Sequence, residues 1–504
     1  MQDGLPPRGD RYDGPSSSVQ AIANYVSASA IIIGAFEMVP LIVLIWNPQE
    51  VRYAPYFIAP SLIVMVLAYL LRFTRADKRA RTYQLTDKEA AACTFLIWVI
   101  GIIAYSAPFV LAGRLGPIQA LFESTSGLTT TGLTLIDPDG YPHILLLHRS
   151  LMQYIGGVGL VLVLTSVVAN NRNLKVYNTE AHTDRLLPGT VATARAILCI
   201  YTAIALIGIL AYILTGMDPF DAVTTALSAI STGGFSTHSF SIAFYDSIAV
   251  EAITIVLMLL GCTNFLLLFL LLRRRFRSVL THIETRAMFG VIVLSTVAIA
   301  LLFCQSDQMT FLHGLRLALF QVISVLSSCG YQTIPSFSDL DSSIILILIA
   351  LMFIGAMAGS TAGGIKLYRF IIAMKGLFWN FQERFGGSDQ VYCHRIDRFG
   401  KRTICTEKEI RDAEVYIVTY VMIFMVGCFI FSLCGASMQE AAFDFASCLG
   451  NTGVGSGFID CDSGPVELCV ASIGMLLGRL EIIPVFAGIA VLSANMRRQA
   501  GYGK

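Results

Sequence analysis

Four short segments of the sequence share a pattern of residue types that suits them to bind a bare cation. Each begins with a hydroxyl or amide residue, followed by any residue, a glycine and an apolar residue. We call residues 130–133, 232–235, 328–331 and 451–454 glycine loops 1 to 4. Glycine lets an extended loop aim successive carbonyl groups to one side, because no Cβ obstructs the turn. Four such loops around one axis would form rings of carbonyl oxygens that replace the hydration shell of a monovalent cation.

The first three residues of every glycine loop are the predicted cation ligands. They are Thr130, Thr131, Gly132, Thr232, Gly233, Gly234, Ser328, Cys329, Gly330, Asn451, Thr452 and Gly453. Loop 4 continues as NTGVGSG and diverges most from the other copies. It is therefore the copy expected to depart most from fourfold symmetry.

The residues before each glycine loop also repeat. A serine lies four positions upstream of every loop, and a leucine or isoleucine lies two positions upstream. The serines are Ser126, Ser228, Ser324 and Ser447. The copies begin about a hundred residues apart, which indicates an internal repeat. Every copy has the same order of segments: a long apolar run, a segment too short to cross a membrane, the loop, and a second apolar run.

The short segments are predicted to be half-helices that end at the glycine loops. Gly116-Pro117 and Asp218-Pro219 mark two starts, since proline is typical of the first helical position and Asp218 can cap it. The partly negative C-terminal ends of the half-helices would then point at the cation. Ordinary outer turns are the alternative for a single loop, but four matching copies disfavour that alternative.

The composition is that of a membrane protein. Of the 504 residues, 55% are hydrophobic and only 14% are charged, and a membrane-spanning helix needs roughly 20 apolar residues. Ten apolar runs are long enough to be read as spans. They are residues 21–46, 54–73, 90–112, 144–169, 191–215, 248–272, 287–304, 343–365, 413–434 and 466–493.

Basic residues are concentrated in alternate loops between the spans. Most of the 35 Lys and Arg residues lie in residues 72–88, 171–195, 273–286, 366–411 and the tail from Arg497. Loops rich in Lys and Arg face the cytoplasm. We therefore expect a multi-pass protein of the cell inner membrane, in contact with lipid, with both termini in the cytoplasm.

These patterns predict an all-α membrane protein with four parallel repeats around a pseudo-fourfold axis, preceded by an extra helical hairpin. Each repeat consists of a span, a half-helix that faces the pore, and a second span. The predicted boundaries are a disordered tail 1–20, a hairpin 21–84, repeats 85–185, 186–280 and 281–382, a cytoplasmic loop 383–410, and repeat 4 at 411–504.

Two features interrupt the apolar spans. Gly355, Gly359, Gly363 and Gly364 lie close together in the span after loop 3, and each glycine costs about 1 kcal/mol in an exposed helix. Close helix packing is the interpretation that spacing alone favours. Arg479 lies within the last span, where a charge costs ~2.5–3.5 kcal/mol at mid-membrane, so we expect it to face the pore. Lys366 is expected at the membrane edge.

The four repeated units, their loops and the segment GSTAGGIKLYR from Gly359 resemble the Trk/Ktr/HKT superfamily of potassium transporters, and its TrkH branch most closely. The resemblance implies one pore within each protomer of a homodimer, with K⁺ as the transported ion. It also implies that the segment from Gly355 to Gly364 is a gate beneath the filter, with an arginine such as Arg479 nearby. TrkH relatives rest on a cytoplasmic ring of nucleotide-binding, TrkA-like regulatory proteins, for which the basic loop 366–411 is a candidate docking surface.

The leading hypothesis is therefore a gated pathway for potassium uptake. The alternative is a symporter that couples K⁺ to H⁺ or Na⁺, but such transporters usually carry inverted repeats and mid-membrane acids. Glu123 and Asp444, each seven positions before its loop, are expected to be structural. No motif for an enzyme, an organic cofactor, a nucleotide site or a nucleic-acid partner is recognisable in the sequence.

Overall fold

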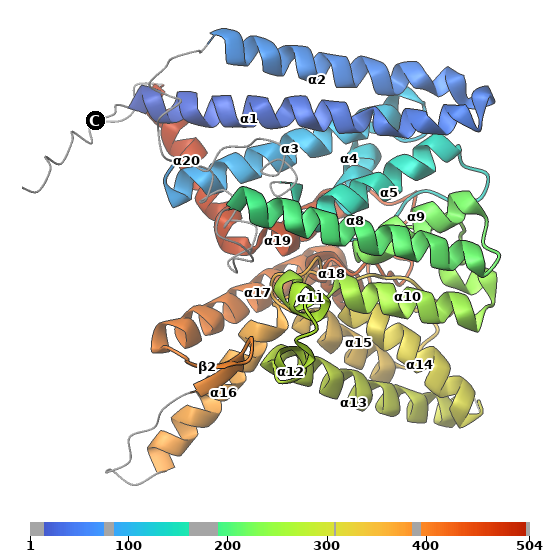
Figure 1. Ribbon diagram of the computed structural model, residues 1–504, viewed down its shortest axis with the longest axis vertical. Coiled ribbons are helices and arrows are strands. Elements are labelled where there is room, and N and C mark those ends of the chain that lie inside the picture. Colours follow the sequence, from blue (N-terminus) through green and yellow to red (C-terminus); the bar gives the residue numbers. More distant parts are fainter. Residues whose placement is uncertain (1–14, 75–84, 161–189, 307–308, 386–394, 500–504) are drawn as a thin grey trace, which may run out of the picture.

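The structure is a computed structural model, and it describes residues 15–74, 85–160, 190–306, 309–385 and 395–499. These residues form a stack of helices that run side by side for much of their length (Figure 1). The exception within the described residues is a small antiparallel hairpin of strands β1 (Arg395–Arg398) and β2 (Lys401–Ile404). This hairpin lies in the predicted cytoplasmic loop 383–410.

The N-terminal hairpin covers one side of the stack. It consists of α1 (Pro15–Glu37), the 3-10 helices η1 (Val39–Ile45) and η2 (Pro48–Tyr53), and α2 (Ala54–Thr74). Figure 1 shows it along one edge of the molecule, next to α3 (Asp87–Leu111). Helix α1 begins inside the range 1–20, which the sequence predicts to be a disordered tail.

Four repeats follow in the predicted order of long helix, half-helix and second helix. Repeat 1 contains α3, α4 (Pro117–Leu128) and α5 (His143–Val158). Repeat 2 contains α8 (Thr190–Leu214), α9 (Pro219–Ile230), η3 (Ser241–Tyr245), α10 (Ile248–Gly261), α11 (Phe265–Leu272) and α12 (Phe276–Leu280). Repeat 3 contains α13 (Ile283–Ser306), α14 (Phe311–Leu326), α15 (Ser342–Ile354) and α16 (Leu367–Phe385). Repeat 4 contains α17 (Glu407–Leu433), α18 (Met438–Gly450), α19 (Pro465–Leu480) and α20 (Ile482–Gln499).

The repeats close into a circle. The second helix of each repeat packs against the half-helix of the next repeat, in the pairs α5 with α9, α10 with α14, α15 with α18, and α19 with α4. Because the last pair joins repeat 4 to repeat 1, the four half-helices surround a common centre. This arrangement is the pseudo-fourfold order that the sequence repeats predict.

Two of the half-helices begin where the capping residues predict. Helix α4 starts at Pro117 and α9 at Pro219, and the Asp218 side chain accepts a hydrogen bond of 2.9 Å from the N–H of Phe220. Helix α18 starts after Ser437, which forms a capping box with Glu440. Such side chains satisfy N–H groups that the first turn leaves without partners.

Two of the predicted spans are bent sharply. Residues 248–272 bend by 110° between α10 and α11, and residues 466–493 bend by 106° between α19 and α20. At the first bend Asn264 caps α11, and its side chain accepts a 2.7 Å hydrogen bond from the N–H of Leu266. At the second, Glu481 adopts a positive φ of 62°. Among the described residues, six helices are long and apolar enough to cross a membrane, or up to eight if each bent pair is one span.

A candidate cation pathway

The four glycine loops have the same backbone geometry. Their first residues have φ between 52° and 57°, and their glycines at the third position have φ between 76° and 94°. In every loop the N–H of the second residue donates a 2.9 Å hydrogen bond to the carbonyl of the repeated serine four positions before the loop. Loop 4 conforms to this geometry, so its divergent sequence does not change its backbone.

Each loop lies against the next around a closed ring. A Cβ added to Gly132 would lie 2.1 Å from the carbonyl oxygen of Gly233, which is the second residue of loop 2. The same approach joins loop 2 to loop 3, loop 3 to loop 4 and loop 4 to loop 1. A Cβ added to the third-position glycine of loops 2, 3 and 4 would lie 2.0, 2.1 and 1.9 Å, respectively, from the carbonyl oxygen of the second residue of the next loop. We call the carbonyl groups of the second residues, which are Thr131, Gly233, Cys329 and Thr452, the carbonyl ring. Glycine at the third position is required both by its positive φ and by this close approach.

Three of the four repeated serines hold their loops in this shape. The Ser126 hydroxyl donates to the carbonyl of Leu133 at 2.6 Å and accepts from the N–H of Gly132 at 3.1 Å. Ser324 donates to the carbonyl of Tyr331 at 2.6 Å, and Ser447 accepts from the N–H of Gly453 at 3.0 Å. A buried hydroxyl at this position therefore satisfies backbone groups that an extended loop cannot pair by itself.

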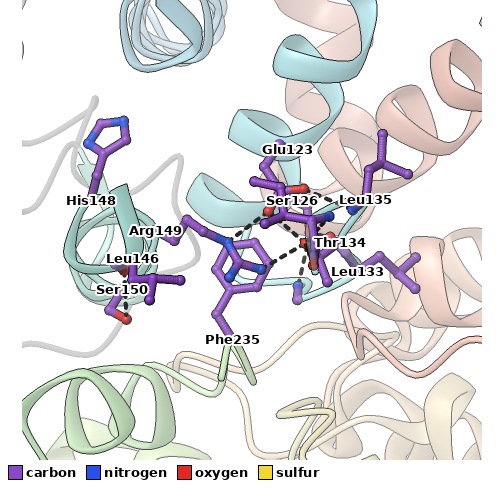
Figure 2. A network of polar contacts seen from close by, with 12 residues as sticks. Glu123, Ser126, Leu133, Thr134, Leu135, Leu146, His148, Arg149, Ser150 and Phe235 are labelled. Carbon is purple, nitrogen blue, oxygen red and sulfur yellow. Dashed lines mark hydrogen bonds and ion pairs between the residues drawn. The ribbon is translucent and has the colours of Figure 1, made fainter. Parts of the chain in front are cut away.

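A buried ion pair supports loop 1 (Figure 2). The Arg149 guanidinium donates to a Glu123 carboxylate oxygen at 2.9 Å, and the two side chains are 2% and 0% exposed. The same carboxylate accepts from the Thr134 hydroxyl at 2.8 Å and from the N–H of Leu135 at 3.1 Å. Because the carboxylate has three donors, the cost of burying its charge is largely offset.

Asp444 has the corresponding position in repeat 4. Its carboxylate accepts a 2.6 Å hydrogen bond from the N–H of Ser456, which lies as far beyond loop 4 as Leu135 lies beyond loop 1. Glu123 and Asp444 thus hold the chain that leaves their loops, which is the structural role expected from the sequence. Sequence reasoning did not identify Arg149 as a partner of Glu123, because the arginine lies on a different helix.

The glycine segment after loop 3 is not helical. Gly355, Gly359 and Gly364 have φ of 64°, 68° and 80°, and residues 355–366 separate α15 from α16. We call residues 355–364 the interrupting segment. Its Thr361 hydroxyl lies 3.0 Å from that of Thr232, and the N–H of Gly363 donates to the Ser328 hydroxyl at 2.8 Å.

The interrupting segment also reaches loop 4. A Cβ on Gly363 would lie 2.3 Å from the carbonyl oxygen of Gly450 and close to the side chain of Asn451. Thr232, Ser328 and Asn451 are the first residues of their loops, directly after the C-terminal ends of the half-helices. The segment therefore packs against the end of the carbonyl ring that lies next to the C-termini of the half-helices. We call this end the inner end of the ring.

Arg479, in α19, contacts both the interrupting segment and the end of α5. Its guanidinium donates to the carbonyl of Thr361 in the interrupting segment and to the carbonyls of Gly156 and Gly157 at the end of α5, the last at 2.8 Å. The Lys366 side chain is buried within the protein, and its Nζ donates to the carbonyl of Ala362. Both cations thus bind backbone carbonyl groups in a non-helical segment or at the end of a helix.

A helical membrane protein with four half-helices around a ring of backbone carbonyls has the architecture of a cation transport protein. The sequence model of TrkH, a family of cation transport proteins, matches residues 57–498. The match includes all four glycine loops and Arg479, and the chain belongs to this family.

Individual relatives agree with this membership. The chain is 30% identical over 427 residues to the Trk system potassium uptake protein TrkH of Vibrio parahaemolyticus, covering 80% of this chain and 85% of that protein. It is 28% identical over 478 residues to an uncharacterized cation transporter of Methanocaldococcus jannaschii, covering 94% and 96%. The crystal structure of the potassium transporter TrkH from Vibrio parahaemolyticus superposes with a TM-score of 0.81 at 26% identity, covering 94% of this chain and 98% of that one. The predicted family and fold are confirmed.

Proposed function

We propose that this protein takes up K⁺ across the cell inner membrane through the carbonyl ring, down the electrochemical gradient. The observation that carries the proposal is the closed ring in which each glycine approaches the carbonyl of the next loop. A dehydrated monovalent cation at the centre would exchange its water ligands for carbonyl oxygens. The partly negative ends of the half-helices would add to its stabilisation. Potassium is the ion named for the TrkH and TrkG relatives.

The interrupting segment is proposed as the gate. It packs against three of the four loops at the inner end of the ring, through a few hydrogen bonds and glycine contacts. Its glycines allow backbone conformations that a helix would not, so the segment can move without unfolding α15 or α16. Arg479 contacts the segment from α19, and we propose that it slows a passing cation and holds the segment in place.

Partners are proposed from the resemblance to the family. A homodimer with one pore in each protomer and a cytoplasmic ring of nucleotide-binding, TrkA-like subunits would fit this chain. The basic loop with hairpin β1–β2 is the proposed docking surface for the ring. Both termini are proposed to lie in the cytoplasm, on the side of the loops rich in Lys and Arg.

Ion flux into liposomes tests the proposed function. Purified protein in liposomes is expected to take up Rb⁺ or K⁺ down its gradient, much faster than Na⁺, and at the same rate with and without a pH gradient. Uptake that depends on an imposed H⁺ or Na⁺ gradient would favour the alternative K⁺/H⁺ or K⁺/Na⁺ symport. Protein-free liposomes provide the background rate.

A further inference from the structure

Loop 2 differs from the other glycine loops at the residue that contributes to the carbonyl ring. That residue is glycine in loop 2, but it is Thr131, Cys329 or Thr452 in the other loops. A glycine restrains the directions of its two peptide groups less than any other residue. In loop 2, therefore, the residue itself restrains the direction of the ring carbonyl less than in any other loop.

The side chain of Gln153, from α5 of repeat 1, occupies the space beside this glycine. A Cβ on Gly233 would lie 2.4 Å from the Gln153 amide carbon. The Gln153 amide nitrogen donates a 2.6 Å hydrogen bond to the Gly233 carbonyl, and its amide oxygen accepts from the N–H of Phe235 at 3.2 Å. Gln153 is fully buried, so the two hydrogen bonds do not compete with bulk water. One side chain thus spans loop 2 from the ring carbonyl to the residue beyond Gly234.

Arg149 holds the same loop one turn earlier on α5. Its guanidinium lies beside the Phe235 ring (Figure 2), 4.1 Å from the ring centroid, and donates a 3.4 Å hydrogen bond to the carbonyl of Ser236. Glu123 fixes the position of this arginine through their ion pair. Loop 2 is therefore held at two points by a helix of repeat 1, and one of these points is connected to the support of loop 1.

The other repeats do not carry this arrangement. The residues at the offset of Gln153 from the loop are Ile255, Leu351 and Gly474, none of which has an amide side chain. Among the residues that the structure describes, no side chain donates a hydrogen bond to the ring carbonyls of Thr131, Cys329 or Thr452. The one ring position with glycine is thus the position with an external donor.

We propose that Gln153, assisted by Arg149, is a positioning residue for ion selection, which takes the place of the missing side chain at Gly233 and fixes the direction of its carbonyl. The inference rests on the proposed function of the ring. Discrimination against the smaller Na⁺ requires that the carbonyls resist moving inward, and a hydrogen bond from outside the ring opposes that movement. Selectivity therefore depends on a contact between repeats 1 and 2 that has no counterpart elsewhere in the ring.

The test compares the K⁺/Na⁺ permeability ratio of reconstituted Gln153→Ala, Gly233→Ala, the double variant and the unchanged protein. Gln153→Ala is expected to lower the ratio about two- to tenfold, the range that corresponds to the net contribution of one hydrogen bond. Gly233→Ala is expected to lower the ratio as well, because its Cβ collides with Gln153. In the double variant the new methyl group enters the vacated space and restrains the loop, so the ratio is expected to recover part of the loss.

Tyr154→Phe is the matched control, since it removes a hydrogen bond of 2.7 Å to Thr202 from the next residue of the same helix without approaching loop 2. Its ratio is expected to be unchanged. If Gln153→Ala does not fold, Gln153→Glu keeps the size and the acceptor but turns a carboxylate oxygen toward the Gly233 carbonyl, and it is expected to lower the ratio.

Three outcomes separate the inference from the proposed function. A folded Gln153→Ala or Gln153→Glu with a normal ratio would overturn the inference while the unchanged protein still selects K⁺. A double variant no better than Gln153→Ala would also overturn it. Unchanged protein that does not conduct K⁺ would instead refute the proposed function itself.

Discussion

Gly132→Ser is expected to lower the K⁺/Na⁺ permeability ratio by about tenfold or more. Gly132 has a φ of 94°, and a Cβ there would lie 2.1 Å from the ring carbonyl of Gly233. Sparsely populated backbone conformations cost a residue with a side chain about 1–3 kcal/mol, and 1.4 kcal/mol corresponds to about a tenfold change in an equilibrium. The loop must change its backbone angles and displace the carbonyl, so one quadrant of the ring loses its geometry. Reversal potentials in mixed K⁺ and Na⁺ solutions measure the ratio.

Gly457→Ser is the matched control for this substitution. Gly457 has a φ of 95°, nearly the same as that of Gly132, but a Cβ there would meet no atom within 4 Å. Backbone strain alone would therefore affect both variants, whereas displacement of a ring carbonyl would affect only Gly132→Ser. An equal change in the two ratios, or none in either, would contradict the assignment of the filter.

Arg479→Ala is expected to speed K⁺ flux several-fold while it leaves the preference for K⁺ over Na⁺ nearly unchanged. Two unit charges about 8 Å apart repel by roughly 2 kcal/mol at an effective dielectric constant near 20. Removing the arginine also removes its hydrogen bonds to the interrupting segment and to the end of α5. The carbonyl ring, where we propose that selection occurs, is not touched by the substitution. Flux of Rb⁺ into liposomes measures the rate.

Arg479→Lys keeps the positive charge and is the matched control. Its K⁺ flux is expected to stay nearly as slow as that of the unchanged protein. A purely structural arginine gives a different result, because its loss would leave buried carbonyl groups without donors and lower stability. An alanine variant that unfolds at a lower temperature in detergent and shows no gain in flux would refute the proposal that Arg479 slows K⁺ flux.

The sequence predicts the parts of the site that recur. Loops with the same serine, apolar residue and glycine appear four times, so the repeat identifies positions that a single copy would leave ambiguous. Four glycines within ten residues mark the span after loop 3, but their spacing alone favours close helix packing, and it is the resemblance to the family that implies an interruption there. In these cases the backbone requirement is met by a residue type that is visible in the sequence.

The bends after α10 and α19 could not be predicted in the same way. The apolar residues of α11 continue the hydropathy of α10, and Glu481 adopts its positive φ without the glycine that usually marks one. A signal was nevertheless present, because both bends lie about as far beyond their loops as Gly355 lies beyond loop 3. Applying the repeat to the second spans would have indicated a break in each of them.

Contacts between segments far apart in the chain are a second class of feature that sequence reasoning missed. The partners Arg149 and Glu123 lie on different helices of repeat 1, and Gln153 contacts a loop 80 residues further along the chain. Lys366 is predicted at the membrane edge, and the structure adds a contact that its residue type does not indicate, since its ammonium group donates to a carbonyl of the non-helical segment before it. Such pairings depend on the packing of distant segments, which residue types alone do not define.

The position of a bound ion tests the central claim most directly. Crystals soaked in Tl⁺, a K⁺ substitute with strong anomalous scattering, are expected to show an anomalous peak on the pseudo-fourfold axis, surrounded by the carbonyl ring. The peak is expected to weaken when K⁺ is added in excess and to persist when Na⁺ is added instead. A ring without Tl⁺, or a peak that Na⁺ displaces as readily as K⁺, would contradict a potassium filter formed by the four glycine loops.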